Sequence, residues 1–120
     1  MYKVSVRKHF DAAHYLRGYG GRCEAVHGHR FEVVVSIEAE DLNEIGIAYD
    51  FTELKGHLGD ILERYDHICL NDLPPFDSIN PSSENIARTV YEELAGRLSG
   101  VVVSSVEVWE SPESKAAYIP

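Results

Sequence analysis

The sequence predicts an α+β fold in which an antiparallel sheet is covered on one face by two helices. Residues 2–10 and 27–39 alternate apolar and polar side chains with the period of two that is typical of strands. Two later segments space their apolar residues as amphipathic helices do. Residues 101–110 and 116–119 resume the alternation, so the expected order is β-β-α-α-β-β, which fits this architecture.

The two N-terminal strands are expected to pair with each other. The alternation of residues 2–10 extends to His14, and the glycine-rich residues 15–26 indicate a loop. The period of two returns over residues 27–39, and residues 41–46 are rich in turn formers. Because consecutive strands that are joined by one loop favour antiparallel pairing, we expect this arrangement here.

Both helices are expected to begin at a capping residue. Asp50 can cap the first helix, and Glu53 follows at the spacing of a capping box. Ser82 or Ser83 can cap the second helix, which we expect to end at Gly100. The expected apolar stripes are Phe51, Leu54, Leu58, Ile61, Leu62 and Tyr65 in the first helix, and Ile86, Val90, Leu94 and Leu98 in the second.

The composition indicates one globular domain, residues 1–120. Hydrophobic residues make up 44% of the 120 residues, enough for a buried core, and charged residues make up 26%. The net charge of −9 repels nucleic acids and anionic membrane surfaces, so we expect neither as a partner. Two cysteines are too few for a disulfide framework, and no segment resembles a secretory signal or a membrane span. These features predict a cytoplasmic protein.

Three histidines carry the strongest indication of function. His27 and His29 share one face of the second strand because alternate residues of a strand do so. His14 ends the first strand, so antiparallel pairing can bring its imidazole to the same place. Each histidine alone is more typical of a surface or hydrogen-bonded residue. Together they predict a catalytic zinc site, in which three protein ligands leave one coordination position open.

Other polar residues near these histidines have two interpretations each. Cys23 can supply a thiolate whose pKa is lowered by a nearby dication, or it can be a small buried residue. Asp66 can orient His67, or the histidine can simply favour the end of the first helix. Glu110, at the end of the third strand, can accept two N–H groups from a guanidine-like heterocycle, or it can be a solvated strand end.

Several short motifs, taken together, resemble those of one known family. They are Phe10-Asp11-Ala12-Ala13-His14, Cys23-Glu24-Ala25-Val26-His27-Gly28-His29, Asp50-Phe51, Asp66-His67 with Leu70-Asn71, Pro81-Ser82-Ser83-Glu84-Asn85, and Glu110 with Tyr118. Over nearly its whole length, the chain is similar to the 6-pyruvoyltetrahydropterin and 6-carboxytetrahydropterin synthases. No single motif is specific, but the combination is.

The resemblance implies a tunnelling fold. Subunits of this fold pair their sheets into a trimeric barrel, and two trimers stack into a hexamer with active sites between subunits. The implied substrate is a small molecule, 7,8-dihydroneopterin triphosphate. Because this substrate is anionic and the chain is acidic, we expect local cations at the entrance, such as Arg17, Arg22 or Lys115, to offset the net charge.

The resemblance also implies a role for each candidate residue. One Zn²⁺ per subunit would be held by the three histidines, and Cys23 would abstract the proton next to the pterin ring. His67, oriented by Asp66, would move a second proton, from the same or a neighbouring subunit. Glu110 would anchor the amino-pyrimidine edge of the pterin. The residues that this family would place near the pterin include Ser82 and Ser83.

The short spacer between Cys23 and His27 is similar to that of the carboxy-forming enzymes of queuosine synthesis. These enzymes release acetaldehyde and triphosphate and leave 6-carboxy-5,6,7,8-tetrahydropterin. The alternatives are a synthase that forms the pyruvoyl product, a non-catalytic zinc-stabilised pterin binder, and a zinc hydrolase. Some relatives cleave the side chain with a glutamate in this loop, but here Glu24 accompanies Cys23 and does not replace it.

Overall fold

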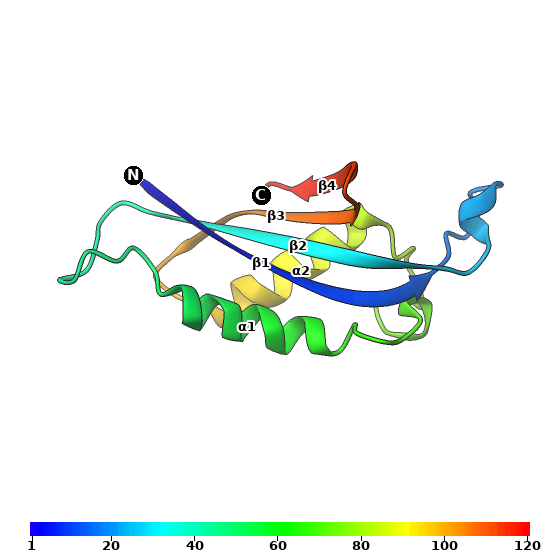
Figure 1. Cartoon of the computed structure of the whole chain (residues 1–120), viewed down its shortest axis with the longest axis horizontal. Helices are drawn as coiled ribbons and strands as arrows, with labels where there is room; N and C mark the ends of the chain where they lie inside the picture. Colours follow the sequence, from blue (N-terminus) through cyan, green and yellow to red (C-terminus); the bar gives the residue numbers. More distant parts are fainter.

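A computed structural model describes all residues, 1–120, and confirms the predicted α+β architecture. The four strands form one antiparallel sheet in the order β1-β2-β3-β4, and both helices lie against the same face of it (Figure 1). Short 3₁₀ helices occupy Arg22–Glu24 and Leu70–Asp72. The strands are β1 (Tyr2–His14), β2 (His27–Ala39), β3 (Val102–Ser111) and β4 (Ser114–Tyr118), and the helices are α1 (Phe51–Glu63) and α2 (Ser83–Arg97).

The core lies between the sheet and the two helices. Alternate residues of β1 and β2 point into it, and the predicted stripes of α1 and α2 face them. Two members of the α1 stripe differ from the prediction. Phe51, in the first turn of the helix, is 55% exposed and does not belong to the core. Tyr65 is fully buried, but it lies in the turn after the helix has ended.

The helix ends correct two details of the prediction. The side chain of Asp50 accepts a hydrogen bond from Thr52 N at 2.7 Å, so it caps α1, but Glu53 does not complete a capping box. Instead, Glu53 lies 4.0 Å from His57, one turn further along the helix. Ser82, not Ser83, caps α2.

Helix α2 stops earlier, and β4 starts earlier, than the sequence predicted. The last helical residue is Arg97, and Gly100, with a φ of 74°, lies in the turn that leads to β3. That positive φ is one that glycine adopts without strain. Strand β4 begins at Ser114, two residues before the expected start.

No helix in the structure has the length and hydropathy needed to cross a membrane.

The pairing of β1 with β2 determines where the histidines lie. In this register His14 is opposite His27, and Ala12 is opposite His29. The molecule is elongated, 53 × 23 × 22 Å, and the loops 15–26 and 64–82 lie at the same end of it (Figure 1). At this end, His14 contacts Pro81 of the second loop and His27 contacts Ala25 of the first. The sheet also has two free edges, at β1 and β4, and one face that no helix covers.

Candidate metal centre and adjoining cavity

Three histidine side chains converge where β1 ends and β2 begins. The imidazole centroid of His14 lies 4.5 Å from that of His27 and 5.3 Å from that of His29. The centroids of His27 and His29 are 4.8 Å apart. One ring nitrogen from each residue lies within 4.8 Å of the other two. The expected convergence of these three residues is therefore present.

Hydrogen bonds fix the tautomers of two of these imidazoles. His14 Nδ1 lies 2.7 Å from the carbonyl oxygen of Pro81, and His27 Nδ1 lies 2.7 Å from that of Ala25. A carbonyl oxygen only accepts, so each Nδ1 carries the proton and donates it. Each Nε2 then keeps a free lone pair. Metal-binding histidines are oriented in this way.

His14 gives the clearest indication that a cation belongs here. Its side chain is 1% exposed, yet its Nε2 is the one buried side-chain nitrogen or oxygen in the structure without a hydrogen-bond partner. Burial is the main cause that lowers the pKa of His14, so its neutral, metal-binding form is favoured. An unpaired buried acceptor is costly unless something binds it. The three nitrogen donors fit Zn²⁺ in type and number.

An aromatic side chain supports the histidines from the core side. Phe31 is fully buried, and its ring centroid lies 5.2 Å from that of His14 and 5.5 Å from that of His29. Phe10 stacks on Phe31 at 4.9 Å and continues this layer into the core. The packing limits rotation of the two imidazoles, so their nitrogens remain directed toward one point.

A cavity of about 260 Å³ opens beside His14 and His27. Cys23 enters it from the loop 15–26, and Glu110 enters it from β3. Four of the residues predicted from the sequence therefore share one cavity with two of the histidines; they are Cys23, Ser82, Ser83 and Glu110. Tyr19 and Lys115 also line this cavity, and Tyr19 is a site residue that no sequence motif indicated.

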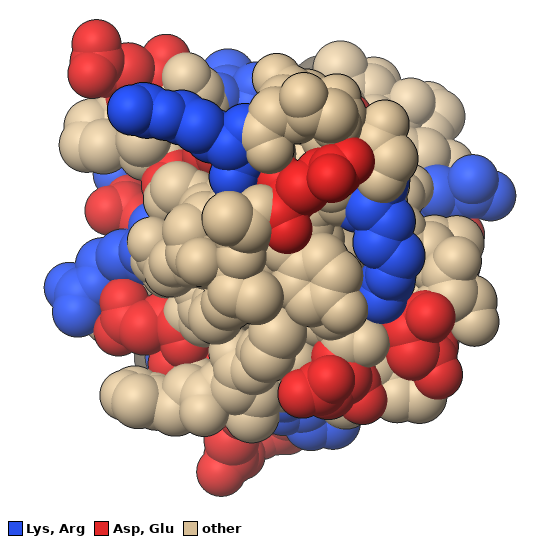
Figure 2. All heavy atoms as spheres, turned by 90° about the vertical axis from the view of Figure 1, so that its right-hand side faces the viewer, with Lys and Arg blue, Asp and Glu red and all other residues tan.

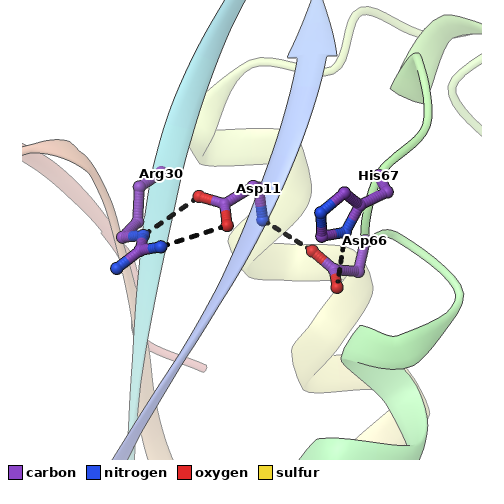
Figure 3. A network of polar contacts seen from close by, with 4 residues as sticks. All are labelled: Asp11, Arg30, Asp66 and His67. Carbon is purple, nitrogen blue, oxygen red and sulfur yellow. Dashed lines mark hydrogen bonds and ion pairs between the residues drawn. The ribbon is translucent and has the colours of Figure 1, made fainter.

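Asp66 and His67 do not line the cavity that contains Cys23. His67 Nδ1 lies 2.9 Å from Asp66 Oδ2, so the predicted carboxylate–imidazole contact is present (Figure 3). The His67 side chain is 79% exposed and lines a separate hollow together with His29 and Cys69. Within one chain, the structure therefore places this pair apart from Cys23.

Strand β1 holds the Asp66–His67 pair through its backbone. Asp11 N donates to Asp66 Oδ1 at 2.8 Å, and His67 N donates to Asp11 O at 2.6 Å. The hydrogen bond from Asp11 N, followed by that from His67, lowers the pKa of Asp66 and favours its carboxylate. Arg30 pairs with the Asp11 side chain at 3.0 Å, as Figure 3 shows. Asp11 and Arg30 were not predicted as site residues, because their contact depends on the strand register that places them opposite each other.

The three cations expected at the entrance, Arg17, Arg22 and Lys115, differ in whether they already contact other groups of the chain. Arg17 donates to Phe76 O at 3.0 Å, and Lys115 lies 3.2 Å from Glu107, so both make contacts within the chain. Arg22, next to Cys23, makes no ion pair or side-chain hydrogen bond. Figure 2 shows acidic and basic side chains dispersed among uncharged residues over this end of the molecule.

Comparisons with known proteins agree on one family. A family model described as 6-pyruvoyl tetrahydropterin synthase matches residues 3–120. A 6-carboxy-5,6,7,8-tetrahydropterin synthase of Synechocystis is 37% identical over 91% of this chain and 86% of the relative. A protein of Archaeoglobus fulgidus, named a putative enzyme of the same kind, is 34% identical over 94% of this chain and 91% of its own.

A solved structure from Caenorhabditis elegans, a 6-pyruvoyl tetrahydropterin synthase, superimposes on this fold with a TM-score of 0.90. It is 26% identical and covers 99% of this chain and 95% of its own. A Plasmodium falciparum structure of the same name is 20% identical with a TM-score of 0.78, which shows the shared fold. The topology described above is therefore that of a recurring fold.

Proposed function

The chain belongs to the 6-pyruvoyl tetrahydropterin synthase family and is an enzyme of that family; from this premise we propose that it is a 6-carboxytetrahydropterin synthase. It converts 7,8-dihydroneopterin triphosphate and one water molecule to 6-carboxy-5,6,7,8-tetrahydropterin, acetaldehyde and triphosphate. The observation that carries the proposal is that Cys23 and Glu110 share one cavity with two of three converging histidines. Residues 1–120 act as one domain, in the cytoplasm, in queuosine biosynthesis.

The proposed zinc ligands are His14, His27 and His29, one ion per subunit. Their support is the unpaired Nε2 of His14 and the proximity of the three ring nitrogens. When bound, zinc supplies a Lewis acid that polarises the hydroxyl and keto oxygens of the substrate side chain. The carbonyl groups of Pro81 and Ala25 orient two of the imidazoles for this role.

Among the remaining cavity residues, one binds the substrate ring and another transfers a proton. Glu110 accepts the N–H groups of the amino-pyrimidine edge, which fixes the ring. Cys23, as a thiolate, removes the proton from the carbon next to the ring. Ser83 and Ser82 lie near the ring, and Ser82 can still donate its hydroxyl proton because its oxygen accepts the bond from Asn85 N.

We infer that the second proton-transfer group comes from a neighbouring subunit. Asp66 and His67 are held beside β1, at one edge of the sheet, whereas Ser114 and Lys115 of β4, at the other edge, line the cavity. If β1 of one copy pairs with β4 of the next, the dyad of one copy approaches the cavity of the other. His67 then moves the proton through Nε2, because Nδ1 is bonded to Asp66. A hexamer of two stacked trimers has this pairing.

A pyruvoyl-forming reaction is the second candidate, and the similarity to the Caenorhabditis elegans enzyme favours it. Eight curated relatives have names that include 6-carboxytetrahydropterin synthase, which favours the first candidate. A side reaction through Glu24 has little support. Its carboxylate accepts a hydrogen bond from Gly20 N at 2.7 Å, and it does not line the cavity.

Product analysis separates these possibilities. The zinc-loaded protein is incubated with 7,8-dihydroneopterin triphosphate, and the pterin products and acetaldehyde are measured. Equal amounts of acetaldehyde and carboxypterin support the proposed function. A pyruvoyl product without acetaldehyde supports the second candidate. Tight pterin binding without turnover would indicate a non-catalytic binder, and water-dependent cleavage of unrelated esters would indicate a hydrolase.

Arg22 is expected to assist binding of the substrate triphosphate. Replacing it with glutamine should raise KM roughly three- to ten-fold at low salt, the effect of losing one partly screened charge contact of about 1 kcal/mol. The difference from the wild type should shrink as salt rises. Arg88→Gln, which removes an exposed arginine paired with Glu92 on α2, is the matched control. Equal KM values for Arg22→Gln and the wild type at all salt concentrations would show that this side chain does not contact the triphosphate.

A further inference from the structure

Two asparagine side chains fasten the base of the loop that carries Cys23. Asn71 Oδ1 accepts from Tyr15 N at 3.0 Å, and Asn71 Nδ2 donates to Tyr15 O at 3.0 Å. In the same way, Asn80 Oδ1 accepts from Arg17 N at 2.9 Å, and Asn80 Nδ2 donates to Arg17 O at 3.0 Å. Each amide thus satisfies both backbone groups of one residue, as a neighbouring strand would. The two side chains continue the hydrogen bonding of β1 past its last residue.

The residue between these two contacts holds Cys23. Leu16 N donates to Cys23 O at 2.7 Å. Leu16 is flanked by Tyr15 and Arg17, whose backbones are bonded to the two asparagines. The position of the Cys23 backbone therefore depends on a segment that is fixed on both sides.

Both asparagines belong to parts of the fold that are themselves anchored. Asn71 is 4% exposed and lies in the short helix Leu70–Asp72, next to the contact between Cys69 and Ala13 of β1. Asn80 O accepts from Asn85 Nδ2 at 2.8 Å, and Asn85 lies in the first turn of α2.

The same support also holds one of the histidines. Pro81, the residue after Asn80, supplies the carbonyl oxygen that binds His14 Nδ1 at 2.7 Å. One short segment at the N-terminus of α2 thus fixes both the loop of Cys23 and the ring of His14. The distance between the thiol of Cys23 and the three-histidine centre therefore depends on this one segment, which contacts both the loop and the ring.

The tip of the loop cannot supply this rigidity by itself. Gly18 and Gly20 have φ values of 79° and 77°, a region that glycine enters freely. The backbone at these positions loses more entropy on ordering than that of other residues. Within the loop, Gly20 N donates to Glu24 Oε1 at 2.7 Å, and the contacts at the base of the loop join this restraint to the rest of the fold.

From these contacts we propose that Asn71 and Asn80 are positioning residues, which hold Cys23 at a fixed place beside the three-histidine centre. Neither side chain touches the substrate in this proposal. Each acts through the backbone of residues 15–17 and the hydrogen bond from Leu16 to Cys23. The catalytic part of the proposal rests on the function proposed above, whereas the placement of the thiol can be measured without turnover.

The experiment compares Asn80→Ala with the wild type by alkylation with iodoacetamide at one pH. Mass spectrometry follows Cys23 and Cys69 separately in the zinc-loaded protein. We expect Cys23 to react about ten-fold faster in the variant, the change that the loss of one or two hydrogen bonds gives to a local opening. The rate at Cys69 should stay the same. In turnover assays kcat should fall while KM and zinc content are unchanged.

Two further variants sharpen the comparison. Asn43→Ala is the matched control, because Asn43 Oδ1 accepts from Ile45 N and Ile47 N in the loop at the opposite end of the molecule. It should leave both cysteine rates and kcat unchanged. Asn80→Asp keeps the acceptor for Arg17 N and loses the donor, so its Cys23 rate should fall between those of the wild type and the alanine variant.

An unchanged Cys23 rate in Asn80→Ala would overturn the proposal. So would equal acceleration of both cysteines together with a lower melting temperature, because that pattern indicates general loosening. If Cys23 alone accelerates but the wild-type protein does not turn over dihydroneopterin triphosphate, the positioning role is supported and the proposed function fails.

Discussion

Replacing His29 with alanine is expected to remove most of the bound zinc and, with it, the turnover. The site offers three imidazoles, so the variant retains two donors, and we expect zinc affinity to fall by more than about 100-fold, beyond the loss seen when a supporting residue is changed. Because His29 lies in β2, opposite Ala12 and next to the ring of Phe31, its replacement also leaves a space beside Phe31. Metal analysis after dialysis against a weak chelator measures the effect.

His57→Ala is the control for the loss of a histidine. His57 lies on α1, near Glu53, and takes no part in the three-histidine centre. The His57→Ala variant should keep one zinc ion per subunit and full turnover. Circular dichroism should show a folded His29→Ala protein, so that metal loss is separated from unfolding. Stoichiometric zinc in folded His29→Ala would remove this residue from the proposed ligand set.

The strands and the convergence of the three histidines could be predicted, because both follow from the alternation of apolar and polar residues along β1 and β2. In a sheet that buries one face, the apolar residues of β1 and β2 must face the helices, and this fixes which histidines share that face. Antiparallel pairing then brings His14 opposite His27. The capping box at Glu53 was wrong, because a favourable spacing does not by itself place the Glu53 carboxylate on the backbone N–H of Asp50; in the structure it lies 4.0 Å from His57.

Other features of the site depend on contacts that no local pattern encodes. Asn71 and Tyr15 are 56 residues apart, and Asn80 and Arg17 are 63 residues apart. These contacts form only after the loop 64–82 has folded against the end of β1. The same holds for His67, whose place outside the Cys23 cavity is set by hydrogen bonds to the backbone of Asp11. Sequence motifs identified the residue types, and tertiary hydrogen bonds decided their positions.

Replacing Cys23 with alanine is expected to abolish turnover while zinc is retained. The thiol lies in the cavity and is outside the group of three histidines, so its loss leaves all proposed ligands in place. Loss of a general base costs roughly 10²- to 10⁴-fold in rate, and we expect kcat to fall by that amount. KM should change little, because Glu110 and the entrance cations remain to bind the substrate. Steady-state kinetics and metal analysis of one preparation measure both effects.

Cys69→Ala tests whether the effect belongs to Cys23 itself. Cys69 is the second cysteine of the chain, and its Sγ lies 3.9 Å from Asn71 Oδ1, away from the cavity that contains Cys23. This variant should keep its zinc and nearly all of its kcat. Cys23→Ser, which keeps a hydroxyl of weaker acidity at the same place, should retain less activity than the wild type and more than Cys23→Ala. Full activity in zinc-loaded Cys23→Ala would show that another group removes the proton, and His67 of a neighbouring subunit would then be the next residue to replace.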